Sequence, residues 1–173
     1  MTVDSIHAIT PIADEFVAVV RTHGEYRLVL DTHVCAGARL FTIRGDVTRT
    51  PTRYSLQVGR DTHIDMPDGY DPEQVLDRFF WRFTNHSCEP NAVVRGREFV
   101  ALHCIEPWSQ ITFNYNTTEF DMAEPFDCRC GSPQCEGVIR GYRWLSPEAR
   151  QRVAPLLADH LRGDRSPVDA AEV

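Results

Sequence analysis

Three cysteines in the last third of the chain have a spacing that suits a metal ion. Cys128, Cys130 and Cys135 form the pattern C-x-C-x4-C. Cysteines one residue apart do not easily pair with each other, whereas their thiolates can converge on one cation, and a structural zinc takes four such ligands at about 2.3 Å. Cys88 is the candidate fourth ligand because it lies in the unusual run NHSCEPN at 85–91. We therefore expect Zn²⁺ to tie the C-terminal segment to that run and to supply folding energy.

Two other interpretations of the cysteines stand beside the zinc site. In one interpretation the thiols are scattered buried groups. In the other they form disulfides in a secreted protein. The first twelve residues show no basic region followed by an apolar stretch, so we expect no secretory signal and a cytoplasmic location, or a nuclear one in a eukaryote. Thiols stay reduced in those compartments, which favours metal binding. Cys35 and Cys104 lie in or beside expected strands and are expected to be small buried hydrophobes.

Composition indicates one globular domain. The chain has 173 residues, 42% hydrophobic and 25% charged, which is enough for a core. No apolar run approaches the ~18–20 residues of a membrane span, so no membrane partner is expected. A net charge of −7 argues against direct binding of nucleic acid and is compatible with a basic partner or with plain solubility. All eighteen basic residues are arginine; lysine is absent, for which genome bias is the simplest explanation.

The pattern of β-branched and aromatic residues predicts many short strands. We expect hairpins at 16–30 and 92–103, further strands at 39–43, 54–58 and 62–65, and a last strand at 111–115. Residues 1–12 carry little structural signal, and we expect their start to be disordered.

Two helices are predicted from their N-terminal residues. Asp71 and Ser146 are each followed by proline, which suits the N-cap and the first helical position. The first helix continues through apolar residues at helical spacing as far as Phe83. In the second, Pro155 predicts a kink or a break, and Gly163 marks the end.

Three motifs, taken in order, resemble the SET domain with its zinc-binding post-SET segment. This is the family of S-adenosylmethionine-dependent protein lysine methyltransferases. The motifs are NHSCEPN at 85–91, ITFNYN at 111–116, and the C-x-C-x4-C pattern followed by Glu136-Gly137. The strand pair before the first motif also fits, so the resemblance covers Tyr54 to Gly141.

The resemblance implies a mainly β fold of small sheets around a knot-like crossing. In such proteins the strand carrying Tyr115 passes through or beneath the loop carrying Asn85 and His86. The implied domains are a SET domain over 13–120, a post-SET zinc segment over 121–145, a C-terminal helix over 146–163 and a disordered tail over 164–173.

The resemblance also implies a role for each matching residue. Tyr115 matches the catalytic tyrosine at a narrow channel into which the target lysine and the cofactor enter from opposite faces. The implied cofactor-binding residues are Asn85, His86, Gly24, Tyr26 and Trp144. The implied walls of the substrate channel are Phe113, Phe83 and Tyr54. The implied zinc ligands are Cys88, Cys128, Cys130 and Cys135.

The chemistry explains why such residues are needed. A free lysine amine has a pKa near ~10.4, and an aromatic channel lowers that pKa by desolvation, which exposes the lone pair that attacks the methyl group. Tyr115 would orient the amine. Phe113 has no hydroxyl to hold a water beside the amine, so we expect that di- or trimethylation is sterically possible.

The chain departs from the family pattern at its N-terminal cofactor loop. The usual Gly-x-Gly is replaced by Gly24-Glu25-Tyr26, with one glycine missing, and the Gly-Asn that often precedes the Asn-His pair is absent. Two alternative functions follow. One is a SET-like binding module that transfers no methyl group, which the missing glycine favours. The other is a SET-fold protein that acts on a small molecule. The retained Asn85, His86 and Tyr115 disfavour the binding module, whereas the small-molecule alternative stays open.

Overall fold

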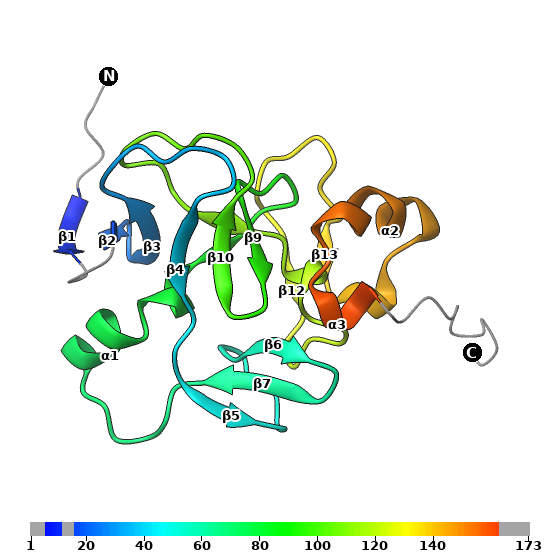
Figure 1. Cartoon of the computed structure of the whole chain (residues 1–173), viewed down its shortest axis with the longest axis horizontal. Helices are drawn as coiled ribbons and strands as arrows, with labels where there is room; N and C mark the ends of the chain where they lie inside the picture. The colour runs from blue at the N-terminus through cyan, green and yellow to red at the C-terminus, as the bar shows by residue number, and fades with distance from the viewer. Residues whose placement is uncertain (1–5, 12–15, 163–173) are drawn as a thin grey trace.

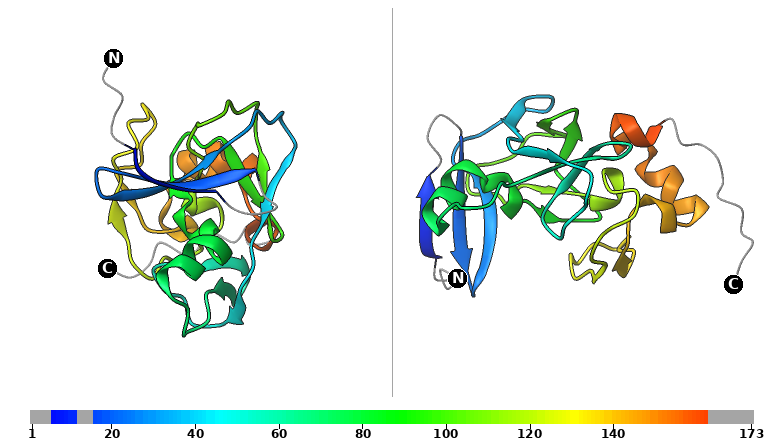
Figure 2. Two further views of the ribbon diagram at one scale, coloured as in Figure 1. Left: turned by 90° about the vertical axis from the view of Figure 1, so that its left-hand side faces the viewer. Right: turned by 90° about the horizontal axis from the view of Figure 1, so that it is seen from below.

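The computed structural model describes residues 6–11 and 16–162, which form five small β-sheets with short helices between them (Figure 1). The N-terminal sheet lies at one end of the molecule and the C-terminal helices lie at the other (Figure 2). This arrangement confirms the expectation of a mainly β fold with little helix.

The N-terminal sheet is antiparallel. Its strands are β1 (Ile6–Pro11), β2 (Val17–Thr22) and β3 (Glu25–Leu30), in the order β1-β2-β3. The predicted hairpin is thus confirmed, with His23 and Gly24 at its turn in left-handed conformations of φ 50° and 84°. Strand β1 was not expected. The structure does not describe residues 1–5, on which the expectation of disorder falls.

Two further three-stranded sheets form the middle of the molecule. One has the order β4-β10-β9, the other β5-β7-β6. Their bounds are β4 (Arg39–Thr42), β5 (Asp46–Thr48), β6 (Leu56–Gly59), β7 (Thr62–Asp65), β9 (Ala92–Arg95) and β10 (Glu98–Ala101). All except β5 were predicted. Gly45, which marked the end of a strand in the sequence, instead lets β5 approach β7, since a Cβ there would lie only 2.3 Å from the Asp65 carbonyl oxygen.

A parallel pair of two-residue strands brings the two central motifs together. Strand β8 (Asn85–His86) pairs with β11 (Thr112–Phe113), so that Asn85 lies opposite Thr112. The expectation that residues 111–115 form the last strand is wrong, because β12 (Phe126–Asp127) and β13 (Val138–Ile139) follow and pair with each other. These strands are too short to show a clear alternating pattern.

The helices begin where the sequence indicated. Helix α1 (Pro72–Arg78) has a capping box at Asp71, and a 3-10 helix (Phe80–Phe83) follows it. The predicted C-terminal helix is broken at Pro155 into α2 (Pro147–Val153), a 3-10 turn and α3 (Asp159–Arg162). The predicted tail lies outside the described residues. Among those that are described, no helix has the length and apolar character needed to cross a membrane.

The main core is shared by the N-terminal sheet, the two middle sheets and β11. Phe99 packs on Phe41 with 4.6 Å between ring centroids, and on Phe113 at 5.0 Å. The C-terminal helices have a separate small cluster of Val153, Leu157 and Leu161. The segment that carries Phe113 and Tyr115 is therefore anchored by buried aromatic packing.

Candidate active site

One large cavity gathers most of the residues singled out in the sequence. Its volume is about 1020 Å³. The walls come from the β2–β3 turn, the loop before β6, the stretch 81–87, the strand β11 and the residues that follow it, and the segment that leads into the cysteines. Segments far apart in the sequence thus meet around one space of the size that binds a small-molecule ligand.

Tyr115 lies in the wall of this cavity with its hydroxyl donating to the Thr84 carbonyl oxygen at 2.8 Å. Its ring packs at 4.6 Å from the ring of Phe113 and at 5.2 Å from that of His86. Burial, and then the nearby Glu119 carboxylate, raise the pKa of Tyr115 well above its usual value. The hydroxyl therefore stays protonated at neutral pH and acts as an orienting group rather than as a base.

His86 connects the β8–β11 pair to the cysteines. Its Nδ1 accepts a hydrogen bond from the Tyr115 backbone N–H at 3.2 Å, so the neutral ring carries its proton on Nε2, 3.3 Å from the Cys88 sulfur. Burial lowers the pKa of His86 to about 4, which keeps the ring neutral at pH 7. Since both ring nitrogens have protein partners, hydrogen bonds from His86 to a cofactor would have to come from its backbone.

Asn85 holds the N-terminal turn in place. Its side-chain amide donates to the Tyr26 carbonyl oxygen at 3.0 Å, and the Tyr26 ring packs against Phe83 at 4.9 Å. Gly24 lines the cavity, and an added Cβ there would meet nothing within 4 Å. Tyr26, which stands where the family pattern has its second glycine, therefore lies in the cavity wall with its ring against Phe83.

The remaining aromatic residues lie at two places. Phe113, Phe83 and Tyr54 line the large cavity, and the Arg82 guanidinium lies over the Tyr54 ring at 4.7 Å. Trp144 lies instead in a neighbouring cavity of about 400 Å³, where its indole N–H donates to Asp121 at 2.8 Å. Phe126 lines both cavities, so Trp144 is adjacent to the main site rather than within it.

The sulfur atoms of Cys88, Cys128, Cys130 and Cys135 all lie within 4.8 Å of one another. We call these residues the four-thiol cluster. Four thiolates around a tetrahedral zinc are about 3.8 Å apart, so the cluster fits that ion. Burial raises the pKa of Cys88 strongly and that of Cys128 to about 11. For Cys130 burial is outweighed by hydrogen bonds to the backbone of Cys88 and Ser132, which lower the pKa to about 7.

The expectation that Cys35 and Cys104 are buried is wrong. Both thiols are exposed, and they lie near each other and near His33. The sequence placed them correctly in or beside extended segments, but those segments run along the surface, so alternate side chains face solvent.

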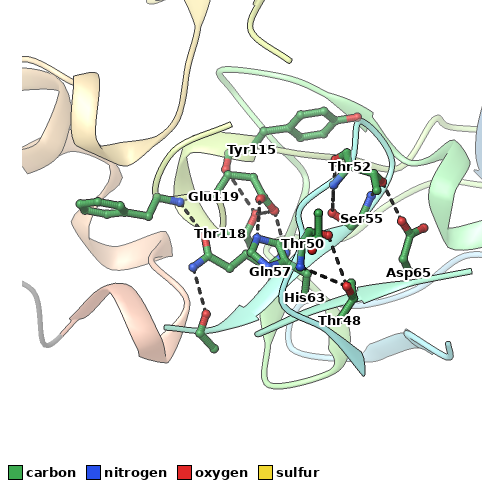
Figure 3. Close-up of polar contacts among 12 residues, drawn as sticks. Thr48, Thr50, Thr52, Ser55, Gln57, His63, Asp65, Tyr115, Thr118 and Glu119 are labelled. Atoms are coloured by element: carbon green, nitrogen blue, oxygen red, sulfur yellow. Dashed lines mark hydrogen bonds and ion pairs between the residues drawn. The ribbon is translucent and has the colours of Figure 1, made fainter. Parts of the chain in front are cut away.

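A buried acid behind Tyr115 was not anticipated from the sequence. Glu119 accepts from the Gln57 backbone N–H at 2.8 Å, lies 3.8 Å from His63, and donates its own backbone N–H to the Tyr115 carbonyl (Figure 3). Burial raises the pKa of Glu119 to about 7 and lowers that of His63. Near pH 7 the Glu119 carboxyl is therefore about half protonated, beside a His63 ring whose charged form is disfavoured. The only sequence signal was a charged residue shortly after the tyrosine motif.

Comparison with known proteins identifies a matching family and related sequences. The family model described as "SET domain" matches residues 7–116. The histone-lysine N-methyltransferase ash1 of Drosophila melanogaster is 41% identical over 85 residues, 44% of this chain and 4% of that protein. The methyltransferase flvH of Aspergillus flavus is 35% identical over 86 residues, 42% of this chain and 48% of that protein. The chain thus spans less than half the length of either relative.

A solved structure shows the same fold. The crystal structure of KRYPTONITE in complex with mCHH DNA, an H3(1–15) peptide and SAH aligns with a TM-score of 0.52 and 22% identity, over 69% of this chain and 28% of that one. Because that neighbour contains DNA, the expectation that this chain makes no direct contact with nucleic acid gains no support. The match over most of the chain, with the parallel pairing of β8 with β11 that brings the two motifs together, leads to one conclusion: the chain belongs to the SET domain family.

Proposed function

We propose that this chain transfers a methyl group from S-adenosylmethionine to the ε-amine of a lysine in a protein. The observation that carries the proposal is the setting of Tyr115, whose hydroxyl is fixed by the Thr84 carbonyl in the wall of a large cavity. Relatives named as histone-lysine N-methyltransferases support the substrate class, as does the neighbour solved with a histone peptide. A lysine-bearing, basic substrate suits the net charge of −7, and a histone substrate implies a nuclear location in a eukaryote.

The large cavity fits the cofactor. Its volume of about 1020 Å³ accommodates an adenosyl ligand, and the open side of Gly24 lets a ligand approach the backbone. Asn85, His86, Gly24 and Tyr26 would hold the cofactor there, and Trp144 would contribute from the neighbouring cavity. Bound S-adenosylmethionine supplies an electrophilic methyl group on a positively charged sulfur.

The protein's own residues prepare the amine. Phe83, Phe113 and Tyr54 surround the lysine side chain with apolar rings, which disfavours the ammonium form. The Tyr115 hydroxyl orients the amine, and its raised pKa excludes it as the base. Alignment of this kind contributes ~7–11 kcal/mol to lowering the barrier.

We further propose that Zn²⁺ in the four-thiol cluster holds a post-SET segment over 121–145 against a SET domain over 13–120. His86 Nε2–H would then donate to the zinc-bound Cys88 thiolate, since the two atoms are 3.3 Å apart. A hydrogen bond to a metal ligand orients that ligand. Zinc would thereby stabilise the wall that carries Phe126.

The test combines binding with transfer. Calorimetry with S-adenosylmethionine on the zinc-loaded chain should show binding, and labelled methyl should pass to lysines of added proteins. Because this sequence contains no lysine, the label cannot come to rest on the enzyme's own lysines. Tyr115→Phe should abolish transfer with little loss of cofactor affinity.

Other outcomes would replace the proposal. Absence of cofactor binding would leave the non-catalytic binding module, and label in small-molecule extracts but not in proteins would show the small-molecule activity. Phe113→Tyr should restrict the product to monomethyl-lysine. If wild type already makes only monomethyl product and the variant does not change it, Phe113 does not set the methyl number.

A further inference from the structure

The second group of thiols lies on two connections that run side by side. One leads from β3 to β4, the other from β10 to β11 (Figure 1). Val34 and Ile105 exchange both backbone hydrogen bonds, at 3.1 and 2.9 Å. Further bonds from Gly37 to Ala101 and from Leu30 to Ser109 extend the contact in both directions. The two connections therefore form a short antiparallel ladder centred on the Val34–Ile105 pair.

This register places four chemically active side chains on one face. Residues on either side of a hydrogen-bonded pair project together to the opposite face of the ladder. Cys35 thus lies opposite Cys104, and His33 lies opposite Glu106. The Nε2 of His33 is 3.7 Å from the Glu106 carboxylate.

Three of these groups converge closely. One ligand atom each of His33, Cys35 and Cys104 lies within 4.8 Å of the others, and all three residues are exposed. We call these three residues the ladder cluster.

We propose that the ladder cluster, with Glu106 beside it, is a second metal site that takes a thiophilic divalent cation of the zinc class. Two thiolates and an imidazole are ligands that this class prefers. On binding, both thiols release their protons to solvent, and two thiolates neutralise the double charge of the ion. A carboxylate next to a ligating histidine fixes the tautomer and strengthens the ligand, which is the role of Glu106.

The site is independent of the four-thiol cluster. It lies on connections of the N-terminal and central sheets, whereas the four-thiol cluster joins β8 to the segment around β12 and β13. A cation here would clamp the β3–β4 connection to the one that leads into β11, and β11 leads directly to Tyr115. The bound cation would thus stiffen the connection that leads into β11.

The experiment measures how many equivalents of metal the whole chain binds. Protein reduced with a phosphine reductant and dialysed against Zn²⁺ should hold two equivalents by elemental analysis. The double variant Cys35→Ser with Cys104→Ser should hold one. Titration with Co²⁺ should give thiolate charge-transfer absorption for a second equivalent, which that variant lacks.

A neighbouring histidine supplies the matched control. His103 is exposed on the same connection but lies one residue out of the ligand register, so His103→Ala should leave the second equivalent unchanged. His33→Ala should weaken it by at least about tenfold, and Glu106→Gln by about 10–100-fold.

The proposal would be overturned by one equivalent in the reduced wild type, by two in the double cysteine variant, or by equal losses for His33→Ala and His103→Ala. A Cys35–Cys104 disulfide that forms with Zn²⁺ present would also overturn it, because the pair would then act as a redox couple.

Discussion

The four-thiol cluster and the ladder cluster differ in what holds them together without a metal. Cys88 lies forty positions before Cys128, and the segment around the other three thiols has only the two-residue strands β12 and β13. The ladder cluster lies on paired backbone whose hydrogen bonds do not depend on its side chains. The thiols of the four-thiol cluster therefore lie on chain with little regular structure, whereas those of the ladder cluster lie on a hydrogen-bonded ladder.

This difference predicts what each metal does. Where little regular structure positions the ligands, the binding free energy of the metal becomes folding free energy. Where the backbone is already paired, the metal adds to a state that exists without it, and its effect follows its concentration relative to its Kd. The four-thiol cluster should thus be a structural requirement, and the ladder cluster a modest addition.

Removal of a ligand from the four-thiol cluster should have the largest effect. Cys130→Ser should release zinc and destabilise the chain on the order of 4 kcal/mol or more, as loss of a structural metal does. Hydrogen exchange should show the opening over 121–145, and elemental analysis should show the metal loss. Cys35→Ser is the control and should leave that segment protected. Two equivalents of zinc retained by Cys130→Ser, where one is expected at the ladder cluster, would break the distinction between the clusters.

The next largest effect should be in the pH dependence of stability, which has opposite signs for the buried Glu119 and for the thiol clusters. Glu119 is buried behind Tyr115, and its pKa of about 7 in the folded chain lies above the ordinary 4.5. Its contribution to stability is fully present below pH 4.5 and is lost as pH rises through 7, by about 3 kcal/mol. Metal binding by thiols changes in the opposite direction, because protons compete for the thiolates at low pH.

Glu119→Gln should remove this slope. Urea unfolding at pH 5 and pH 8 should show wild type losing about 2.5 kcal/mol more than the variant, because part of the loss has already occurred at pH 5. Gln keeps an oxygen for the Gln57 N–H, so the backbone contact can persist. Equal changes in the two proteins would mean that Glu119 is already ionised in the folded state at pH 5.

The sequence was sufficient for what short motifs encode. The turn at Gly24, the caps at Asp71 and Ser146, and the break at Pro155 follow from local chemistry and are found in the structure. In each of these cases a few neighbouring residues determine the outcome. The four thiols also lie together as expected, three because of their C-x-C-x4-C spacing and Cys88 because it belongs to the NHSCEPN motif.

What the sequence did not give depends on register between distant segments. Cys35 and Cys104 meet only because Val34 pairs with Ile105, and no local pattern specifies that pairing. Glu119 is buried because Gln57, 62 positions earlier, donates to it. Strand β5 exists because β7 lies beside Gly45. Such partners become visible only when the chain is folded.

A smaller effect should follow from the hydrogen bond behind Cys88. His86→Ala removes the Nε2–H that lies 3.3 Å from the Cys88 sulfur and should weaken zinc at the four-thiol cluster by about 10–100-fold. Competition with a chromophoric chelator would measure the change. Tyr115→Phe is the control, because the backbone N–H that His86 accepts from remains. A similar loss in both would attribute the effect to packing instead.

The smallest effect should be at the ladder cluster without metal. Cys35 is exposed and the ladder's hydrogen bonds are between backbone atoms, so Cys35→Ser should change stability in metal-free buffer by less than about 0.5 kcal/mol. With Zn²⁺ at 100 times its Kd, wild type should gain about 2.7 kcal/mol that the variant does not. Both proteins refill the four-thiol cluster when Zn²⁺ is added, so thermal unfolding with and without Zn²⁺ would show the difference as a larger rise in Tm for wild type than for the variant. A large loss in the metal-free variant would instead mean that the thiol itself supports the ladder, and the contrast between the clusters would then be one of degree.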